Sequence, residues 1–388
     1  MSTFHKRVLL TDGYARQTLP MAKSFHDLGC TVTTLCFSKS DVGYCTKYAD
    51  EHILMGCGKE EYDKQAQQVT DLLKSGQYDL VVPMTDYSAI YLSERKQQLS
   101  QYAYIAVNDP KQFSLAINKI NTMRICQEQG IPAPKTLFSE NPAEDIDRSG
   151  LEYPVVIKPQ TACGSIGFSI IHSKDQLIRA LENYDAANGA LFVQEYIPQD
   201  GPQYGAEVFR DRNGRFSALL IDEKSRWFPL DGGTSTINVT IHHEQMKQMS
   251  EALLNAMDWN GYANIDFVMD SRDGQPKIIE VNGRISAVAK LDFCAGIDLG
   301  RLILENAFSH EITCYNSYPD DIRTSCCLTE LLWFLKSKDR WHSKPSIFSR
   351  KNTRDVIFSW SDMRPFFGFC LQSAKNYKSA MAKRKRAE

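Results

Sequence analysis

The chain has 388 residues, of which 43% are hydrophobic and 24% are charged, and its formal net charge is −2. This length exceeds what one compact core supports and predicts two or three domains in a protein of ordinary globular composition. No run of 18 apolar residues occurs, which excludes a membrane-spanning helix. The charge is uneven: residues 331–388 hold 14 Lys and Arg against 4 Asp and Glu, a net +10 that leaves −12 on the rest. Such a basic end fits either an anionic partner or a solvated, frayed terminus.

The cysteine pattern and the first residues indicate a compartment. The 11 cysteines are odd in number and include no CxxC pair and no Cys/His spacing typical of zinc. The opening MSTFHKRVLL lacks the long apolar segment of a signal peptide. We therefore expect free thiols in a reducing cytoplasm, with Cys326 and Cys327 as buried thiols rather than a redox pair.

Short apolar runs alternate with helical patterns over the first hundred residues. We expect strands in RVLLTDG, TVTTLCF, YDLVVPMTD and AYIAVND, with helices at 15–29 and around 60–75. This alternation predicts a parallel α/β sheet. The first turn, TDGYAR, does not match GxGxxG, so a nicotinamide-binding Rossmann site is poorly supported.

The pattern changes after residue 108. DPKQFSLAINKINTMRICQEQGIPAP predicts a pair of helices, YPVVIKPQTACGSIGFSII a strand, loop and strand, and ALFVQEYI a further strand within an α+β stretch reaching about residue 310. The small side chains of Gly164, Ser165 and Gly167 would let backbone N–H groups approach an anion, and Lys158 would add a charge beside them. The alternative is an ordinary Gly/Ser hairpin with an exposed lysine, and the Walker A pattern is absent.

Polar residues alternate along KIIEVNGRIS at residues 277–286. Side chains two apart on a strand share one side of the sheet, so Glu280, Asn282 and Arg284 form a polar row. Such a row needs water, a partner or a ligand. The alternative is an exposed strand face with a Glu–Arg pair that contributes under about 1 kcal/mol.

The order of these motifs resembles the ATP-grasp superfamily, and most closely its branch of carbamoyl-phosphate synthase large subunits and biotin carboxylases. Lys119 before GIPAP, Lys158 with its glycine loop, VQEYI, and NIDFVMD with IIEVNGR follow in the family's order. The resemblance covers about residues 5–310 and is strongest over 115–290. It implies an N-terminal parallel α/β (pre-ATP-grasp) domain followed by a two-lobed α+β ATP-grasp domain. The implied boundaries are 1–108 for the first domain, 109–310 for the second (lobes 109–190 and 191–310), and 311–388 for a basic, aromatic C-terminal extension.

The resemblance also implies residues for ATP, which lies between the two lobes in this family. The matching positions are the phosphate lysines Lys119 and Lys158, the loop glycines and serine Gly164, Ser165 and Gly167, the adenine hinge Gln194, Glu195 and Ile197, and the ribose position Gln203. Many relatives carry Glu then Lys at the start of the hinge and an acid at the ribose position. The Gln–Glu hinge and Gln203 therefore weaken any side-chain role there, and Glu207 is the alternative for the ribose.

The resemblance assigns the polar row to a metal and to catalysis. Asp266, Glu280 and Asn282 match the family's metal ligands, and their hard oxygens suit Mg²⁺ or Mn²⁺. Arg284 would face the γ-phosphate and the substrate carboxylate, and with Lys158 it is the expected catalytic residue. The implied enzyme is an ATP- and magnesium-dependent ligase. It would activate a carboxylate as an acyl phosphate for attack by an amine or other nucleophile, with release of ADP and phosphate.

The substrate wall and two other classes of function stay open in the sequence. DEKSRWFPLDGGTSTINVT is the expected wall, with Lys224 and Arg226 holding an anionic small molecule, although a surface hairpin explains the same charges. The changed hinge and Gln203 are compatible with an ATP-binding protein of the same fold without turnover, whereas the retention of Asp266, Glu280, Asn282 and Arg284 argues against it. A nucleic-acid binder would use the basic tail, but no recognisable binding module is present, so we expect no nucleic acid.

The C-terminal extension combines basic and aromatic residues. Its aromatic residues are Trp333, Phe334, Trp341, Phe348, Phe358, Trp360, Phe366, Phe367 and Phe369. This composition is typical of an element that lies on an anionic membrane, so peripheral contact with the inner membrane face is one hypothesis. The other is that the aromatics pack back on the ATP-binding domains and only AKRKRAE is loose. A homodimer is a further prediction.

Overall fold

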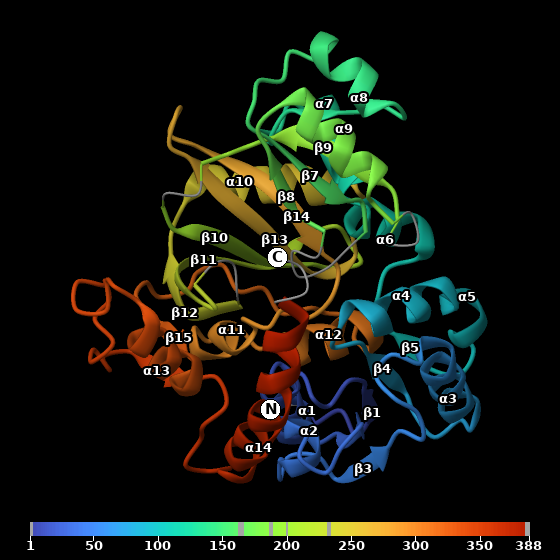
Figure 1. Cartoon of the computed structure of the whole chain (residues 1–388). Helices are drawn as coiled ribbons and strands as arrows, with labels where there is room; N and C mark the ends of the chain where they lie inside the picture. Colours follow the sequence, from blue (N-terminus) through green and yellow to red (C-terminus); the bar gives the residue numbers. More distant parts are fainter. Residues whose placement is uncertain (1–2, 162–166, 186–188, 199–200, 231–233, 385–388) are drawn as a thin grey trace.

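The structure is a computed structural model that describes residues 3–161, 167–185, 189–198, 201–230 and 234–384, with side chains to residue 374. It contains three β-sheets, and the third is extended by the C-terminal segment (Figure 1). The arrangement confirms the expected mixture of a parallel α/β part and an antiparallel α+β part.

The first sheet is parallel and has the strand order β3-β2-β1-β4-β5. Its strands are β1 (Arg7–Leu10), β2 (Thr31–Cys36), β3 (Glu51–Leu54), β4 (Leu80–Val82) and β5 (Tyr104–Ile105), and its helices are α1 (Thr18–Asp27), α2 (Val42–Cys45), α3 (Tyr62–Lys74), α4 (Asp86–Glu94) and α5 (Lys96–Leu99). The short strand β3 was not predicted, because EHIL at the sheet edge lacks a continuous apolar run. The strand order reverses between the neighbours β1 and β4, and in open α/β sheets such a switch point is where ligands commonly bind.

The second sheet is antiparallel, with the order β6-β9-β7-β8. The elements of this part are the predicted helix pair α6 (Pro110–Ile117) and α7 (Lys119–Glu128), the strands β6 (Thr136–Leu137), β7 (Val155–Pro159), β8 (Ser169–Ile171) and β9 (Leu191–Glu195), and the short helices α8 (Pro142–Asp145), η1 (Ile146–Arg148) and α9 (Lys174–Glu182). Val155, Ile157, Val193 and Leu177 form its own small core. This core is separate from the two large ones, as expected for a lobe that sits on the rest of the molecule.

The third sheet has seven strands in the order β14-β13-β10-β11-β12-β15-β16. Its strands are β10 (Gln203–Arg210), β11 (Phe216–Phe228), β12 (Thr234–Ile241), β13 (Gly261–Asp270), β14 (Gln275–Asn282), β15 (Arg323–Ser325) and β16 (Thr353–Asp355), accompanied by helices α10 (Glu244–Ala256), α11 (Lys290–Cys294) and α12 (Leu299–Phe308). One face, with Ala206, Ile265 and Val281, packs with α10 in an apolar core. The polar row of β14 therefore lies on the opposite face.

The two large cores run across the expected boundary at residue 108. Val8 and Leu80 of the first sheet belong to the same apolar cluster as Phe209 and Leu302. The first sheet thus packs directly on the third sheet and α12, and the domain limits at 108 and 310 stay predictions.

The C-terminal segment adds to the fold. Strands β15 and β16 extend the third sheet, α13 (Cys327–Lys336) contacts β11 and β12, and α14 (Arg364–Arg384) lies against α2. A Cβ added to Gly368 would lie 2.7 Å from the Ser40 carbonyl oxygen, so this helix approaches the first domain closely. Trp333 is buried, whereas Trp341, Phe348 and Trp360 are 67%, 68% and 84% exposed, so the aromatics pack back only in part.

Two further observations concern the described residues. The ten cysteines among them are all free, with Cys326 buried and Cys327 partly buried. No helix in this part of the chain is long and apolar enough to cross a membrane.

Candidate active site

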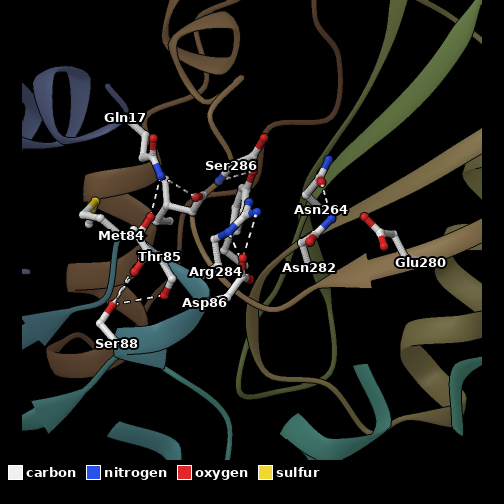
Figure 2. Close-up of polar contacts among 12 residues, drawn as sticks. Gln17, Met84, Thr85, Asp86, Ser88, Asn264, Glu280, Asn282, Arg284 and Ser286 are labelled. Atoms are coloured by element: carbon white, nitrogen blue, oxygen red, sulfur yellow. Dashed lines mark hydrogen bonds and ion pairs between the residues drawn. The ribbon is translucent and has the colours of Figure 1, made fainter. Parts of the chain in front are cut away.

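The pairing of β13 with β14 positions the three expected metal ligands. Antiparallel register places Asp266 opposite Glu280 and Asn264 opposite Asn282, so these side chains share one face of adjacent strands. The amide nitrogen of Asn282 donates to Asn264 Oδ1 at 3.0 Å and to Asp266 Oδ2 at 3.2 Å. Figure 2 shows Glu280, Asn282 and Asn264 on this face. Two carboxylates and an amide therefore lie together as hard oxygen donors.

Each of these carboxylates is paired with a lysine. Lys119 Nζ lies 3.1 Å from Glu280 Oε2, and Lys224 Nζ lies 2.5 Å from Asp266 Oδ1. Lys119 is the first residue of α7, and its backbone N–H donates to the Gln160 carbonyl at the end of β7. Burial lowers the pKa of Lys224, but the charges of Asp266 and Asp222 outweigh that effect and raise it above its ordinary value. Lys224, expected in the substrate wall, thus contacts Asp266, one of the expected metal ligands.

The contact of Lys224 with Asp266 depends on a glycine. Gly205 of β10 lies between Asp222 of β11 and Asp266 of β13 in the sheet. A Cβ there would lie 3.1 Å from Lys224 Nζ and would collide with an oxygen of Asp222. The missing side chain leaves the space through which the lysine crosses the strand.

Lys158 is the last residue but one of β7 and faces the same region from the smaller lobe. The pKa of Lys158 is lowered to about 8, chiefly because the side chain is buried. The negative charge of Glu280 acts in the opposite direction, and the positive charge of Lys119 adds to the lowering. Its Nζ lies 5.3 Å from the centre of the Phe192 ring. A nearby anion such as a phosphate would stabilise the charged form of this lysine.

The glycine loop after β7 is described only in part. Gly164 and Ser165 lie outside the described residues. Gly167 has φ +75°, and a Cβ there would lie 2.7 Å from Pro159 Cγ. This position therefore requires glycine both for its backbone conformation and for its packing against the end of β7.

The side chains of the expected adenine hinge are engaged with neighbouring strands. Gln194 donates to Thr136 Oγ1 at 2.8 Å and is buried. The Glu195 carboxylate accepts from Arg272 at 2.6 Å, and its backbone N–H donates to the Lys135 carbonyl. Any recognition of adenine here would have to use other groups, such as the backbone at Ile197.

The two candidates for binding the ribose, Gln203 and Glu207, both lie on strand β10. Gln203 begins β10 and pairs with Lys224 of β11. Glu207, the alternative, is 2% exposed and accepts hydrogen bonds from the Tyr262 hydroxyl and from Asn264. Both of its oxygens are engaged, so it is not available to a ribose hydroxyl.

Arg284 leaves the third sheet and reaches the first. Its Nε lies 3.2 Å from Asp86 Oδ1, and its Nη2 lies 3.4 Å from Asp86 Oδ2 (Figure 2). Asp86 is the first residue of α4, where Thr85 and Ser88 form a capping box. The Gln17 side chain donates to the Met84 and Ile285 carbonyls, which ties the loops after β1 and β4 to the end of β14.

Sequence reasoning missed Asp86 and the switch point between β1 and β4. The signal was present, because TDGYAR and MTDYS follow the apolar runs that became β1 and β4. Polar residues at the carboxyl ends of parallel strands indicate a binding crevice where the strand order reverses.

Arg226 is not brought to this cluster. It is 2% exposed, its Nε donates to Glu330 Oε1 at 3.0 Å, and its guanidinium lies 5.1 Å from the Trp333 ring. Register shifts on both sides of Arg226 interrupt the alternation that would have placed it beside Lys224. Its described contacts hold α13 onto the third sheet.

The comparisons with known proteins concern the sequence family and the fold. A family model described as ATP-grasp domain matches residues 116–288. The chain is 28% identical over 259 residues to a D-aspartate ligase of Enterococcus faecium, covering 60% of this chain and 59% of the relative. It is 28% identical over 197 residues to the carbamoyl phosphate synthase large chain of Methanothermobacter thermautotrophicus, covering 48% of this chain and 18% of the relative.

A solved structure shows the same fold over most of the chain. The biotin carboxylase domain dimer of Hydrogenobacter thermophilus 2-oxoglutarate carboxylase, in complex with MgADP, ADP and bicarbonate, aligns with a TM-score of 0.67 and 17% identity. The alignment covers 82% of this chain and 73% of that one. Residues 116–288 therefore match an ATP-grasp domain, as the motif order predicted, and the relatives include a carbamoyl phosphate synthase large chain. The biotin carboxylase domain shares the fold. Its match spans about 59% of the D-aspartate ligase, so the activity of that relative does not transfer by similarity alone.

Proposed function

We propose that the protein is an ATP- and magnesium-dependent ligase that activates a substrate carboxylate as an acyl phosphate. An amine or related nucleophile then displaces phosphate, and the products include ADP. The observation that carries this proposal is the cluster of Lys119, Lys158, Asp266 and Glu280. Arg284 follows two residues after Asn282 and pairs with Asp86 of the first domain. Such a concentration of opposite charges is suited to binding a polyphosphate with its cation and orienting a carboxylate beside it.

The donor set fits a hard divalent cation. Asp266 and Glu280 provide carboxylate oxygens from adjacent strands, and Asn282 provides an amide oxygen. Among the described residues no three His, Cys, Asp or Glu side chains form a metal cluster, so phosphate oxygens and water would complete the coordination. When bound, Mg²⁺ or Mn²⁺ would neutralise charge on the phosphate oxygens.

The cationic side chains have separate roles in this proposal. Lys119 and Lys158 would bind the phosphates, and a phosphate that approaches them would compete with Glu280 for Lys119. Arg284 would bind the substrate carboxylate, because its planar fork matches two oxygens at once. Positioning and charge stabilisation then account for catalysis, and no covalent nucleophile is required.

A screen of ADP release tests this function. Pairs of carboxylic acids and amines are incubated with ATP and Mg²⁺, and we expect release to require one carboxylate and to be lost in Glu280→Gln. The D-aspartate ligase among the relatives makes amino acids the first compounds to test. Binding of ATP without carboxylate-dependent release from any pair would instead support the second candidate, an ATP-binding protein without turnover, which the engaged hinge side chains favour.

The proposed partners are small molecules in the cytoplasm, and no nucleic acid is expected. A homodimer is part of the proposal. A second proposal concerns peripheral contact of the C-terminal segment with an anionic membrane. The comparisons do not support that contact, and the exposure of Trp341, Phe348 and Trp360 is the observation that favours it.

A further inference from the structure

A chain of buried hydrogen bonds passes through Glu207 in the middle of β10. We propose that Glu207 is a positioning residue, which sets the direction of the Asn282 amide at the expected metal site and anchors the loop that follows β14. This inference rests on the proposed function, because Asn282 is a metal ligand only within that function. One buried carboxyl group would then organise two parts of the same site.

The first arm of the chain runs from Glu207 to the metal site through Asn264. Asn264 Nδ2 donates to Glu207 Oε1 at 2.9 Å, and Asn264 Oδ1 accepts from Asn282 Nδ2 at 3.0 Å (Figure 2). An amide carries a donor on one side and an acceptor on the other, so a partner that accepts from Asn264 turns its oxygen toward Asn282. Asn282 Nδ2 also donates to Asp266 Oδ2 at 3.2 Å. Its amide oxygen is therefore the atom that it can offer to a cation.

The second arm runs from Glu207 to the loop after β14 through Tyr262. The Tyr262 hydroxyl donates to Glu207 Oε2 and accepts from the backbone N–H of Ser286 at 3.2 Å. Ser286 is buried and lies two residues beyond Arg284. Tyr262 and Asn264 are two residues apart on β13, and Asn264 pairs with Glu207 across the sheet. Because alternate residues of a strand share one face, both arms reach the carboxyl group on the same side of the sheet.

Glu207 differs from a buried carboxylate that holds the fold together. It is 2% exposed, and it has no ion pair within the part of the chain that the structure describes. Glu330, which is also buried, pairs with Arg226. Burial and the negative charges of Asp292 and Asp222 raise the pKa of Glu207 well above its ordinary value. A carboxyl group buried without a cation destabilises a fold, so we attribute its presence to the site that it orients.

The direction of the first arm does not depend on the charge of Glu207. Whether ionised or protonated, a carboxyl group keeps an oxygen that accepts a hydrogen bond from Asn264. A glutamine at this position also keeps an acceptor oxygen, whereas a leucine of similar size has none. These two substitutions therefore separate the hydrogen-bonding role of Glu207 from any effect of its charge on a nearby cation.

The first measurement is metal binding without turnover. Mn²⁺ is titrated into the full-length protein in the presence of a non-hydrolysable ATP analogue, and free Mn²⁺ is followed by electron paramagnetic resonance. We expect Glu207→Leu to weaken Mn²⁺ binding about 10- to 100-fold, the effect of removing the partner that orients a metal ligand. Glu207→Gln should retain most of the wild-type affinity. Glu223→Leu is the matched control, because Glu223 pairs with Tyr204 on the opposite face of the sheet.

The second measurement separates the two arms. Asn264→Leu cuts the first arm and should weaken Mn²⁺ binding, while hydrogen exchange of the Ser286 amide stays slow. Tyr262→Phe cuts the second arm and should speed that exchange, which mass spectrometry follows in the peptide covering residues 283–287, while Mn²⁺ affinity stays as in the wild type. Glu207→Leu should show both effects. A residue that only supported the fold would not divide its effects in this way.

Folding and the proposed function are controlled independently. Cooperative urea unfolding checks each variant, and Asn264→Leu with Tyr262→Phe carries the test if Glu207→Leu does not fold. Equal loss of Mn²⁺ affinity in Glu207→Gln and Glu207→Leu overturns the inference, as does a loss of both readouts in each single-arm variant. Loss of Mn²⁺ binding in Glu280→Gln but not in folded Glu207→Leu leaves the ligase standing and refutes the role of Glu207. Wild-type binding in Glu280→Gln refutes the metal site itself.

Discussion

Lys158 shows how burial prepares a single residue for an anion. In the free protein its pKa is lowered to about 8 from 10.5, chiefly by burial. Between these two values the unfolded chain holds a proton that the folded protein has lost, so this residue makes stability rise with pH across that window. A bound phosphate favours the charged lysine, so binding should draw the proton back.

We predict that nucleotide binding near pH 8–9 takes up a proton at Lys158 and that affinity falls as pH rises through about 8. Calorimetry in buffers of different ionisation enthalpy measures this uptake. In Lys158→Met the uptake should vanish and affinity at pH 7 should fall about 10- to 100-fold. Lys174→Met, whose lysine pairs with Asp147 on the same lobe, should match the wild type. Proton uptake that persists in Lys158→Met would place the titrating group elsewhere.

At the scale of elements, the packing in the middle of the third sheet depends on Gly205 of β10, which has no side chain. Gly205→Ala would press a methyl group toward Lys224 and Asp222. We predict a loss of about 1–3 kcal/mol in the free energy of unfolding, together with loss of the Lys224–Asp266 contact and of turnover. Urea denaturation measures the first effect, and Gly201→Ala, with open space around its Cβ, is the control. Equal stability of the two variants would contradict the tight fit.

The helix α13 depends on one buried ion pair. Glu330→Ala leaves Arg226 and Thr236 without their shared partner at a buried position. Removing one member of such a pair costs about 3–5 kcal/mol. Glu128→Ala, on the exposed side of α7, should change stability little. Thermal unfolding of both variants checks the expectation, and a small effect in Glu330→Ala would show that α13 is held by its apolar contacts alone.

At the scale of the whole molecule, the C-terminal segment presents exposed aromatic side chains on the surface. Trp341 and Phe348 stack with ring centres 6.1 Å apart and are both largely exposed. Residues 331–351 around them hold six Lys and Arg and a single acid, Asp339. Aromatic and basic groups together favour an anionic lipid surface, with about 1 kcal/mol per basic residue.

The membrane proposal predicts that the full-length protein sediments with phosphatidylserine vesicles at low salt and is released at high salt, since the attraction is screened. Replacing Trp341 and Phe348 with Ser should abolish sedimentation. The matched control replaces Tyr62 and Tyr87, which stack in the first domain. A wild-type protein that stays in the supernatant at low salt would show that the segment serves only the fold.

The sequence by itself determined the class of fold and, through the order of its motifs, the presence of an ATP-grasp domain. Strand–helix alternation and period-2 alternation are local patterns, so they predicted the parallel first sheet and the shared face of Glu280 and Asn282 without knowledge of the rest. The motif order likewise predicted the ATP-grasp domain that the family match confirms. Gly164 and Ser165 fall outside the described residues, and the other residue roles remain predictions.

Only the tertiary structure decided which partner each charged side chain has. Lys224 meets Asp266 because Gly205 opens a path between strands, and Arg226 meets Glu330 because register shifts break the alternation of β11. Arg284 meets Asp86 because the first sheet packs on the third, across 198 residues of chain. Local periodicity fixes the side of a strand on which a residue lies, whereas the identity of its neighbour depends on register, bulges and the packing of sheets formed far apart in the chain.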